Sequence, residues 1–397
     1  GILNRQLRPA GGQQTMNIAA ELAAGSKAHN TATNPLTGGI QVTICYNRDH
    51  IKAVEINNTR PFAVTRLFRE KPVDRVLAMM PSLFYICGMG QLIAALRAVE
   101  SAAGISETLV IKQARDTLLF AESLREQVFS WVTNWAPQHK SRMSNVVDWF
   151  NQCRKQLDWS LTLSSATSGE AGCQPALEQL ARQLEEVIKP LLPANQAGSS
   201  LATMGLSTQV CQLLKACGKY PLGLAAKTLN LTESQQLTVV LTSLKAAEAE
   251  QFCHQPTVNG APAETGRWAR QNIEARGFLI ESRLRSLYRE ITTAPMRLRS
   301  IVRQHQFSQA EGTGVRGCSV VETARGSLLH KVELDNRNHV AKYQIIAPTE
   351  WNFHPQGSLK TMLEGLYLPW DQVTPVAETL IKLLDPCVSW QLELVHA

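Results

Sequence analysis

The end of the chain, L-L-D-P-C-V-S-W-Q-L-E-L-V-H-A (residues 383–397), contains a thiol directly behind Asp-Pro. A second isolated thiol lies near the other end, in F-Y-I-C-G-M-G-Q (residues 84–91). Both Cys87 and Cys387 adjoin residues typical of tight turns, which could leave the thiol accessible. Thiolates from opposite ends of a chain close a soft-metal site only when the whole fold is in place. The pair therefore links the fold to a candidate metal site.

The composition is that of a globular protein. The chain has 397 residues, of which 44% are hydrophobic, enough for one large core or two. The net charge is +7, and the arginine excess falls within residues 267–303, where acidic residues are interleaved. This pattern favours a solvated helix face over a nucleic-acid surface, since aromatic interleaving and a nucleic-acid-binding motif are missing. An acidic protein partner stays open.

The cysteines and the N-terminal region indicate the compartment. Nine widely spaced cysteines, an odd number, argue against a disulfide framework and for a reducing environment. No signal peptide precedes the first expected strand, so we expect a cytoplasmic protein. The uncharged stretch 76–96 contains proline and glycines, which favours a buried helix with a turn over a membrane span. We expect residues 1–38 to be a flexible extension, with residues 1–15 partly foreign to the native chain because Met16 follows them.

The hydrophobic periodicity predicts an α+β fold that is mostly α, with a helical body and small β-elements from the N- and C-terminal segments. A single domain is expected over residues 39–397. Its parts are a β-hairpin and first thiol segment (39–104), a helical body (105–310), and a β-element with the C-terminal thiol segment (311–397). Within them we expect a hairpin over 39–58, helices over 73–80, 92–103 and 376–384, a long arginine-rich helix over 265–289, and strand-like segments over 317–334 and 339–346.

Most other candidate groups have an ordinary structural explanation. Single cysteines in apolar runs are usually buried small hydrophobes, and this applies to Cys45, Cys153, Cys173, Cys253 and Cys318. Cys211 and Cys217 are six residues apart on an expected helix and point to different faces. His330 could support a ligand as a hydrogen-bond donor or could be a satisfied core histidine. The loop G-T-G-V-R-G (312–317) precedes a strand instead of a helix, which argues against phosphate binding.

Two short segments near the C-terminus contain groups that suit an anion. In E-T-A-R-G-S-L-L-H (322–330), Arg325 lies at a break in the expected strand, and Thr349 lies in A-P-T-E-W-N (347–352). A guanidinium offers a fixed fork of donors to an anionic acceptor, and a hydroxyl can add one more. The alternative is a surface ion pair with a turn threonine.

Taken together and in order, the motifs resemble the large subunit of nickel-iron hydrogenases. The matching segments run from residue 57 to 390: N-N-T-R-P-F (57–62), F-Y-I-C-G-M-G-Q (84–91), A-E-T-G-R-W-A-R (263–270), E-T-A-R-G-S-L-L-H (322–330), Y-Q-I-I-A-P-T-E-W-N (343–352) and L-D-P-C-V-S-W (384–390). The resemblance implies the large-subunit fold, with helices around a buried site that the two terminal segments close.

The resemblance also implies that hydrogen turnover is lost. In the family two C-x-x-C pairs hold nickel and iron, whereas here Gly90 and Trp390 stand at the second, bridging positions. Nickel would keep two thiolates instead of four, so nickel is not expected. Ala63 replaces the glutamate thought to relay protons, and Glu393 replaces the histidine of the C-terminal processing motif.

The chain keeps Arg325, Thr349 and Asp385, which match family residues near the iron, but has lost the second cysteine of each pair. In this combination it is similar to the large-subunit-like maturation proteins of the HupK/HoxV type. The resemblance implies a non-catalytic scaffold that holds an iron-dicyanide-carbonyl fragment, Fe(CN)2CO, with Cys87 and Cys387 on iron. The cofactor-binding positions it implies are Arg325, Pro348, Thr349 and Asp385. Implied partners are the maturation proteins that build the fragment and the apo large subunit. Because the two cysteines match terminal nickel ligands, both sulfurs must shift toward iron, or only one binds. The alternatives are a metal-free assembly chaperone and a divergent hydrogenase.

Overall fold

The computed structural model describes residues 38–396 apart from residues 61, 85, 165–172, 193–203, 232–233, 272–278 and 304–313. The expected N-terminal extension therefore lies almost wholly outside the described residues, and the domain bounds stay a prediction. Among the described residues, no helix combines the length and apolar composition that crossing a lipid bilayer requires.

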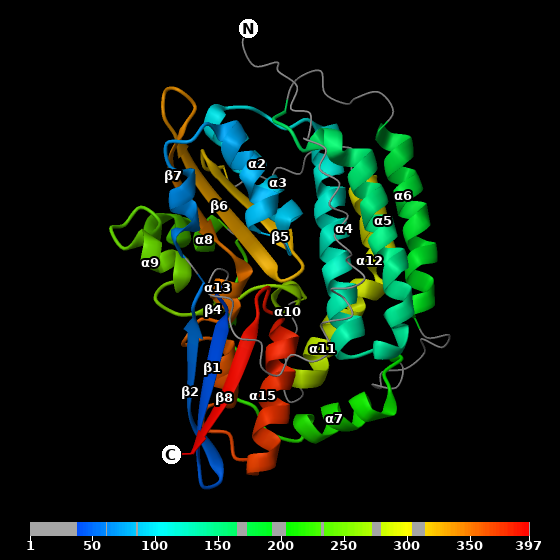
Figure 1. Cartoon of the computed structure of the whole chain (residues 1–397), viewed down its shortest axis with the longest axis vertical. Helices are drawn as coiled ribbons and strands as arrows, with labels where there is room; N and C mark the ends of the chain where they lie inside the picture. Colours follow the sequence, from blue (N-terminus) through cyan, green and yellow to red (C-terminus); the bar gives the residue numbers. More distant parts are fainter. Residues whose placement is uncertain are drawn as a thin grey trace. The chain divides into compact units, whose positions relative to one another are not determined.

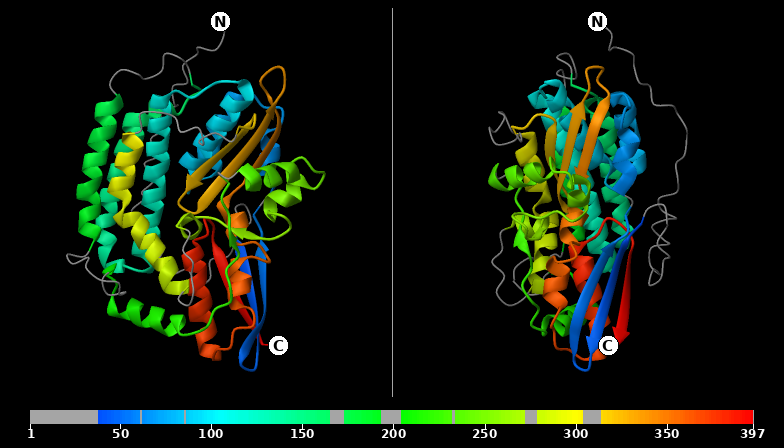
Figure 2. Two further views of the ribbon diagram at one scale, coloured as in Figure 1. Left: turned by 180° about the vertical axis from the view of Figure 1, so that it is seen from behind. Right: turned by 90° about the vertical axis from the view of Figure 1, so that its left-hand side faces the viewer.

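Long helices form one side of the described structure (Figure 1). They are α4 (Leu109–Asn134), α5 (Met143–Leu157), α6 (Cys173–Ile188), α11 (Leu279–Thr292) and α12 (Ala294–Val302). Thr108 starts α4 because its side chain accepts the Ile111 backbone N–H, one of the donors that a helix start leaves unpaired. Seen from behind, α12 lies between α6 and α4 (Figure 2), and all three pack together. The predicted helical body is thus confirmed.

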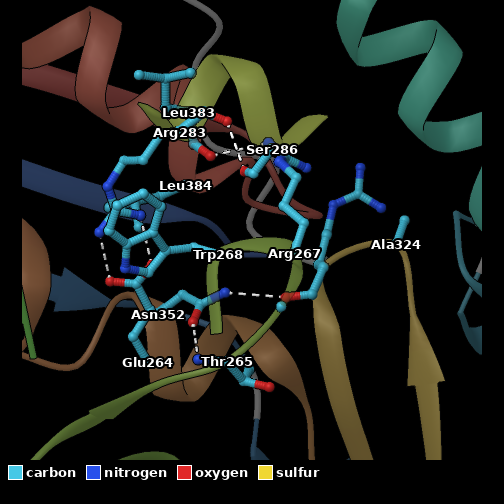
Figure 3. Close-up of a pocket in the computed structure, with 12 residues that line it drawn as sticks. Glu264, Thr265, Arg267, Trp268, Arg283, Ser286, Ala324, Asn352, Leu383 and Leu384 are labelled. Carbon is cyan, nitrogen blue, oxygen red and sulfur yellow. Dashed lines mark hydrogen bonds and ion pairs between the residues drawn. The ribbon is translucent and has the colours of Figure 1, made fainter. Parts of the chain in front are cut away.

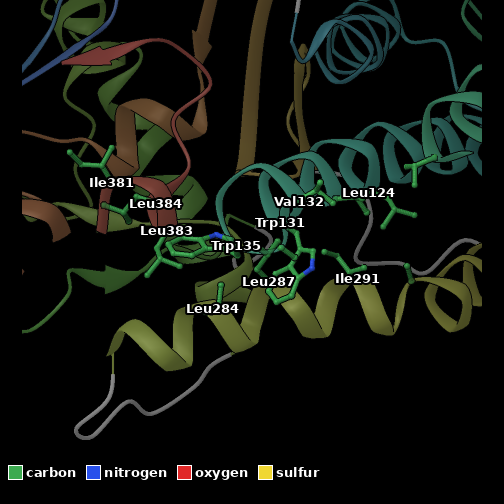
Figure 4. Packing of buried hydrophobic residues seen from close by; sticks show 14 of the residues in the cluster. Leu124, Trp131, Val132, Trp135, Leu284, Leu287, Ile291, Ile381, Leu383 and Leu384 are labelled. Carbon is green, nitrogen blue, oxygen red and sulfur yellow. The ribbon is translucent and has the colours of Figure 1, made fainter. Parts of the chain in front are cut away.

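The core of this helical side is formed by large apolar side chains from elements far apart in the chain. Trp131 of α4 and Trp135, the residue directly after that helix, lie next to Leu284 and Leu287 of α11 (Figure 4). Leu383, near the end of α15 (Trp370–Leu384), belongs to the same cluster. Burying a side chain of this size contributes about 1.5–3 kcal/mol. The packing holds the end of α15, and hence the residues that follow it, against the helical side.

A three-stranded antiparallel sheet lies beside this body, in the order β5 (Cys318–Thr323), β6 (Gly326–Leu334) and β7 (Val340–Ile346). Helix α3 (Gly88–Ala103) packs on β5 and β6. The expected strand over 317–334 is two strands, because the chain turns sharply at Ala324 and Arg325. Gly326 allows this turn, since its φ is 133° and a Cβ there would lie 2.4 Å from Thr265. The turn places Arg325 at the tip of a hairpin.

The second sheet has the order β2 (His50–Asn58), β1 (Ile40–Asn47), β8 (Trp390–His396). Strands β1 and β2 form the expected hairpin. Strand β8 was not expected; it pairs in parallel with β1, with Ile40 opposite Trp390. The backbone N–H of Ile40 donates to the Ser389 carbonyl at 2.9 Å. The first described strand and the last residues of the chain are therefore joined directly behind Cys387.

The predicted long helix over 265–289 is wrong. Residues 263–264 form a short strand, α10 spans only Arg267–Arg270, and α11 begins at Leu279. Gly266, with a φ of 107°, directly precedes α10, in a place where a Cβ would lie 2.6 Å from the Arg325 carbonyl, and α10 itself ends with Gln271 as its C-cap. The prediction that the arginines lie on a solvated helix face is also wrong for Arg267 and Arg283, which are both buried. A buried guanidinium needs a partner, and Arg283 pairs with Glu264 at 2.8 Å.

Shorter elements complete the described residues. The remaining helices and strands are α2 (Val73–Leu83), α7 (Thr208–Gly218), β3 (Lys227–Thr228), α8 (Ser234–Ser243), α9 (Ala249–His254), β4 (Ala263–Glu264), α13 (Pro348–Asn352) and α14 (Ser358–Leu363). Four 3-10 segments lie at Phe62–Phe68, Pro137–Arg142, Asp158–Ser160 and Lys189–Leu191.

Candidate metal centre

Cys87 is presented by the start of helix α3. It is the residue directly before the helix, and the backbone N–H of Gln91 donates to its carbonyl at 2.9 Å. The Gln91 side-chain amide donates to the Cys87 sulfur at 3.8 Å. The helix was expected to begin at Leu92, but it begins at Gly88. Cys87 therefore lies at a helix N-terminus, whose partial positive charge favours a thiolate but does not outweigh the effect of burial on its pKa.

Cys387 is presented by the end of helix α15. Asp385 ends that helix in the left-handed conformation, with a φ of 55°, and Pro386 prevents the helix from continuing. The Cys387 sulfur then lies 3.0 Å from the hydroxyl oxygen of Thr349. Thr349 is buried in the first turn of α13, which Pro348 opens. The structure thus brings together Cys387 and Thr349, two of the residues singled out from the sequence.

The two thiols are close enough for their charges to interact. Burial, followed by the charges of Cys387 and Glu122, raises the pKa of Cys87 to about 12, while Arg325 and Arg60 act in the opposite direction. Cys87 is therefore a neutral thiol at physiological pH, and a metal would have to displace its proton. Both thiols are partly buried and free of disulfides. The predicted convergence of the two chain ends at one place is present.

Arg325 lies between the two terminal segments. Its Nε donates to the Asp385 carbonyl at 2.9 Å, and its Nη2 donates to Glu126 at 3.4 Å. Burial would lower the pKa of Arg325, but Asp385, Glu126 and the two thiols raise it above its usual value. No described residue accepts a hydrogen bond from Nη1. That nitrogen is available for an anionic acceptor.

Asp385 forms an ion pair with Arg325. Its carboxylate Oδ2 lies 3.7 Å from Nε of Arg325 and 3.5 Å from Nη1 of the buried Arg267. The guanidinium of Arg267 also donates to the Leu383 carbonyl at 2.9 Å. Asp385 therefore shares its single negative charge between two buried guanidinium groups. Its role is to position the arginines, and direct binding of a cofactor by Asp385 or Pro348 stays a prediction.

A small cavity, shown in Figure 3, is lined by Arg325 together with Arg267, Arg283 and Asn352 among others. It measures about 20 Å³, enough for a single water molecule. The Asn352 amide donates to the Arg325 carbonyl at 3.1 Å, and its oxygen accepts the Thr265 backbone N–H at 2.9 Å (Figure 3). The cavity is too small for a cofactor.

One cation at the site has no role in the sequence analysis. Arg60 pairs with the buried Glu350 at 2.7 Å. Burial would lower its pKa, but Glu350 and then both thiols raise it. The charge of Arg60, which follows strand β2, thus interacts with both Cys87 and Cys387, as the charge of Arg325 does. The signal was present, since Arg60 belongs to the quoted segment 57–62.

A buried carboxylate was also missed. Glu122 of α4 accepts the backbone N–H groups of Met89 and Gly90 at 2.9 and 2.8 Å. Burial raises its pKa to about 7, although the two backbone bonds act in the opposite direction. The sequence signal is its position four residues after Leu118, on the apolar face of the helix.

His330 is a satisfied core histidine, and its support of a ligand stays a prediction. It is fully buried, and burial lowers its pKa to about 3, so the ring is neutral. One ring nitrogen lies 2.8 Å from the Tyr343 hydroxyl and the other lies 2.9 Å from the Gln91 side-chain oxygen. His330 is a satisfied core residue that also orients the amide reaching Cys87.

The residues present suit a metal that brings its own ligands. Within the described part of the chain, no group of three or more His, Cys, Asp or Glu side chains is arranged to hold a metal ion. Gly90 has no side chain, and Trp390 starts β8, so a nickel ion with four protein thiolates does not fit. An iron fragment with diatomic ligands needs few protein ligands and several donors around it. Two thiols, the free Nη1 of Arg325 and the Thr349 hydroxyl meet that requirement.

Known proteins with similar sequences share nearly the whole chain. The family described as nickel-dependent hydrogenase matches residues 228–389. The chain is 29% identical to the hydrogenase expression/formation protein HupK of Azotobacter vinelandii, over 91% of this chain and all of that protein. It is 26% identical to the hydrogenase expression/formation protein HoxV of Cupriavidus necator, over 86% of this chain and 93% of the other. The resemblance to large-subunit-like maturation proteins is confirmed.

Solved structures confirm the fold. The [NiFeSe]-hydrogenase of Dm. baculatum matches with a TM-score of 0.60, over 89% of this chain and 97% of that chain, at 14% sequence identity. The Ni-Fe-Se hydrogenase of D. vulgaris Hildenborough matches with a TM-score of 0.59 over the same shares. The expected α+β architecture of the hydrogenase large subunit is therefore correct.

Proposed function

We propose that this chain, a large-subunit-like relative of the hydrogenase expression/formation proteins, is a non-catalytic scaffold in nickel-iron hydrogenase maturation. It holds the Fe(CN)2CO fragment before transfer to the apo large subunit. The observation that carries the proposal is the meeting of Cys87 and Cys387 beside Arg325 and Thr349, with Gly90 at a position where the hydrogenases have a third thiol.

Each residue has a defined task in this proposal. Cys87 and Cys387 bind the iron, and Cys87 releases its proton as it does so. The Nη1 of Arg325 and the Thr349 hydroxyl donate to the outward-facing cyanide nitrogens. Charge-assisted bonds of this kind contribute roughly 1.5–3 kcal/mol each. The fragment itself supplies a low-spin iron whose remaining ligands are already in place.

The charge balance of the site agrees with an anionic ligand. Two thiolates and two cyanides on iron(II) give a net negative complex, which a buried site tolerates only beside cations. Arg325 and Arg60 face the thiols from two sides, and both are held in position by carboxylates behind them. The cations are thus fixed before the ligand arrives, which lowers the cost of ordering them on binding.

An infrared spectrum tests the proposal. The full chain is purified from a host that produces the iron fragment, and we expect cyanide and carbonyl stretching bands together with about one iron per chain. A chain that binds its maturation partners but shows no such bands is a metal-free assembly chaperone, and the scaffold proposal is then wrong.

A second measurement separates the scaffold from a divergent hydrogenase. The same preparation is analysed for nickel and for hydrogen uptake. We expect neither, because the described residues offer no four-thiolate site. Nickel at about one per chain with hydrogen uptake would make the chain an enzyme.

The proposed partners are the proteins that assemble the iron fragment and the apo large subunit that receives it. The names of the relatives, which are hydrogenase expression/formation proteins, support a role in hydrogenase assembly. Transfer is tested by mixing the loaded chain with the apo large subunit. The infrared bands should move from the fraction containing this chain to the fraction containing the large subunit.

A further inference from the structure

Helix α3, which presents Cys87, is capped by a side chain from another helix. Cys87 itself forms no side-chain cap, so the first N–H groups of the helix need other acceptors. The two oxygens of Glu122 on α4 accept the N–H groups of Met89 and Gly90. A carboxylate at this place also interacts favourably with the helix dipole. Glu122 therefore fixes the segment that carries the first thiol.

The same carboxylate lies against Gly90. A Cβ added to Gly90 would lie 3.3 Å from Oε2 of Glu122 and 3.3 Å from Cγ2 of Thr323. Contacts of this length are tighter than ordinary side-chain packing, so even a methyl group requires a neighbour to move. Thr323 has little freedom, because it is buried in β5 and its hydroxyl donates to the Gly326 carbonyl at 2.9 Å. A side chain at position 90 therefore requires Glu122 to shift by a few tenths of an ångström.

The negative charge of Glu122 disfavours a thiolate at position 90, as the lack of space does. The carboxylate of Glu122 already disfavours the thiolate form of Cys87. A sulfur on residue 90 would be bonded to a Cβ in direct contact with that carboxylate. Two like charges at such a separation in a buried site repel strongly.

We propose that Glu122 limits this site to two thiols, because its carboxylate occupies the space and supplies the charge that exclude a sulfur at position 90. The inference deepens the proposed function and rests on it in one respect: it names what keeps the site closed to nickel while leaving it open to an iron that carries its own ligands. Gly90 and Glu122 then act together in keeping a third sulfur out of the site.

The test uses nickel alone on the metal-free, reduced full chain, and so does not depend on the iron fragment. Nickel is titrated into the native chain, Gly90→Cys, and Gly90→Cys/Glu122→Ala, with thiolate-to-nickel absorbance as the readout. We expect Gly90→Cys to bind no more tightly than the native chain, and the double variant to bind at least about tenfold more tightly. The control is Gly90→Cys/Glu178→Ala, which removes an exposed carboxylate of α6 instead; it should behave like Gly90→Cys.

The outcome that overturns the proposal is Gly90→Cys binding nickel as tightly as the double variant. Failure of the native chain to show cyanide and carbonyl bands would instead count against the proposed function and leave this result standing. Circular dichroism checks that each variant is folded. If the alanine variant is not folded, Gly90→Cys/Glu122→Gln replaces it; glutamine keeps one acceptor for the helix start and the same volume, so this variant tests the charge alone.

Discussion

The hydroxyl oxygen of Thr349 lies 3.0 Å from the sulfur of Cys387, although the two residues belong to different elements and are separated by the whole of α15. The contact depends on two backbone features. Pro348 starts the short helix that carries the threonine, and the left-handed Asp385 turns the chain back toward it. The thiol therefore faces a hydrogen-bonding partner that is already fixed before any ligand arrives.

Thr349→Val removes that hydroxyl and keeps the side-chain shape. We expect faster alkylation of Cys387 in the metal-free chain and about tenfold weaker iron retention, equivalent to about 1.4 kcal/mol. Thr379→Val is a matched control, since the Thr379 hydroxyl contacts the buried Cys217 sulfur at 3.8 Å, away from the site. Equal iron loss in both variants would show that the Thr349 hydroxyl has no specific role.

Cys87→Ser and Cys387→Ser test the metal ligands directly. Each should reduce iron by about tenfold or more, because serine is a poor ligand for a soft metal and stays protonated. The fold should be unchanged, since both thiols are only partly buried. Cys211→Ser, another partly buried thiol on α7, should retain full iron. Iron at the native level in both site variants would make these thiols structural.

Arg325→Lys tests the donor fork. Lysine keeps the charge but cannot bond Asp385 and Glu126 while also donating to a cyanide. We expect a shift of the cyanide bands and a loss of about 1.5–3 kcal/mol in fragment binding. Arg285→Lys, whose arginine pairs with Glu281 on the partly exposed side of α11, is the control and should leave the bands unchanged. Unshifted bands in Arg325→Lys would remove Arg325 from the proposed ligand contacts.

The hairpin, most of the helical body and the two terminal thiols could be predicted from the sequence because each depends on local pattern. What was missed depends on contacts between distant residues. Strand β8 alternates as W-Q-L-E-L-V-H, but its pairing with β1 joins residues about 350 positions apart and has no local signal. Likewise the arginine-rich pattern has no local sign that Arg267 and Arg283 are buried, since each is paired there with a carboxylate from another element, Asp385 or Glu264. Tertiary contact overrides propensity at both places.

The pH dependence of stability should report Glu122. Its pKa is raised to about 7 in the folded chain, from about 4.5 when exposed. A raised pKa means that the folded state binds the proton more tightly, so this contribution to stability is fully present below about pH 4.5 and is lost as the pH rises through 7. The free energy of unfolding measured in urea should therefore fall between about pH 5 and 7, by an amount on the order of 3 kcal/mol for the native chain.

The comparison variant for this pH effect is Glu122→Gln, which cannot titrate. Its stability should be flatter over the same pH range, and the difference between the two chains isolates the one carboxylate. Parallel pH profiles would mean that Glu122 is ionised throughout, with the two backbone bonds outweighing burial.

The buried ion pair of Arg283 and Glu264 should contribute strongly to the free energy of unfolding of the chain. Both side chains are almost completely buried, and Glu264 also accepts a bond from the Ser358 hydroxyl. Glu264→Ala leaves the Arg283 charge without a partner and should cost about 3–5 kcal/mol in urea unfolding. The exposed pair of Arg299 and Glu185 provides the contrast, since Glu185→Ala should cost less than about 1 kcal/mol.

A second variant separates the charge of this pair from its packing. Arg283→Met/Glu264→Leu removes both charges and keeps apolar volume, so it should recover most of the stability lost in Glu264→Ala. Because Thr265, next to Glu264, is bonded to Asn352, which holds the Arg325 carbonyl, Glu264→Ala should also weaken iron retention. Stability lost with iron retention unchanged would show that the arginine hairpin is held independently of the layer beneath it.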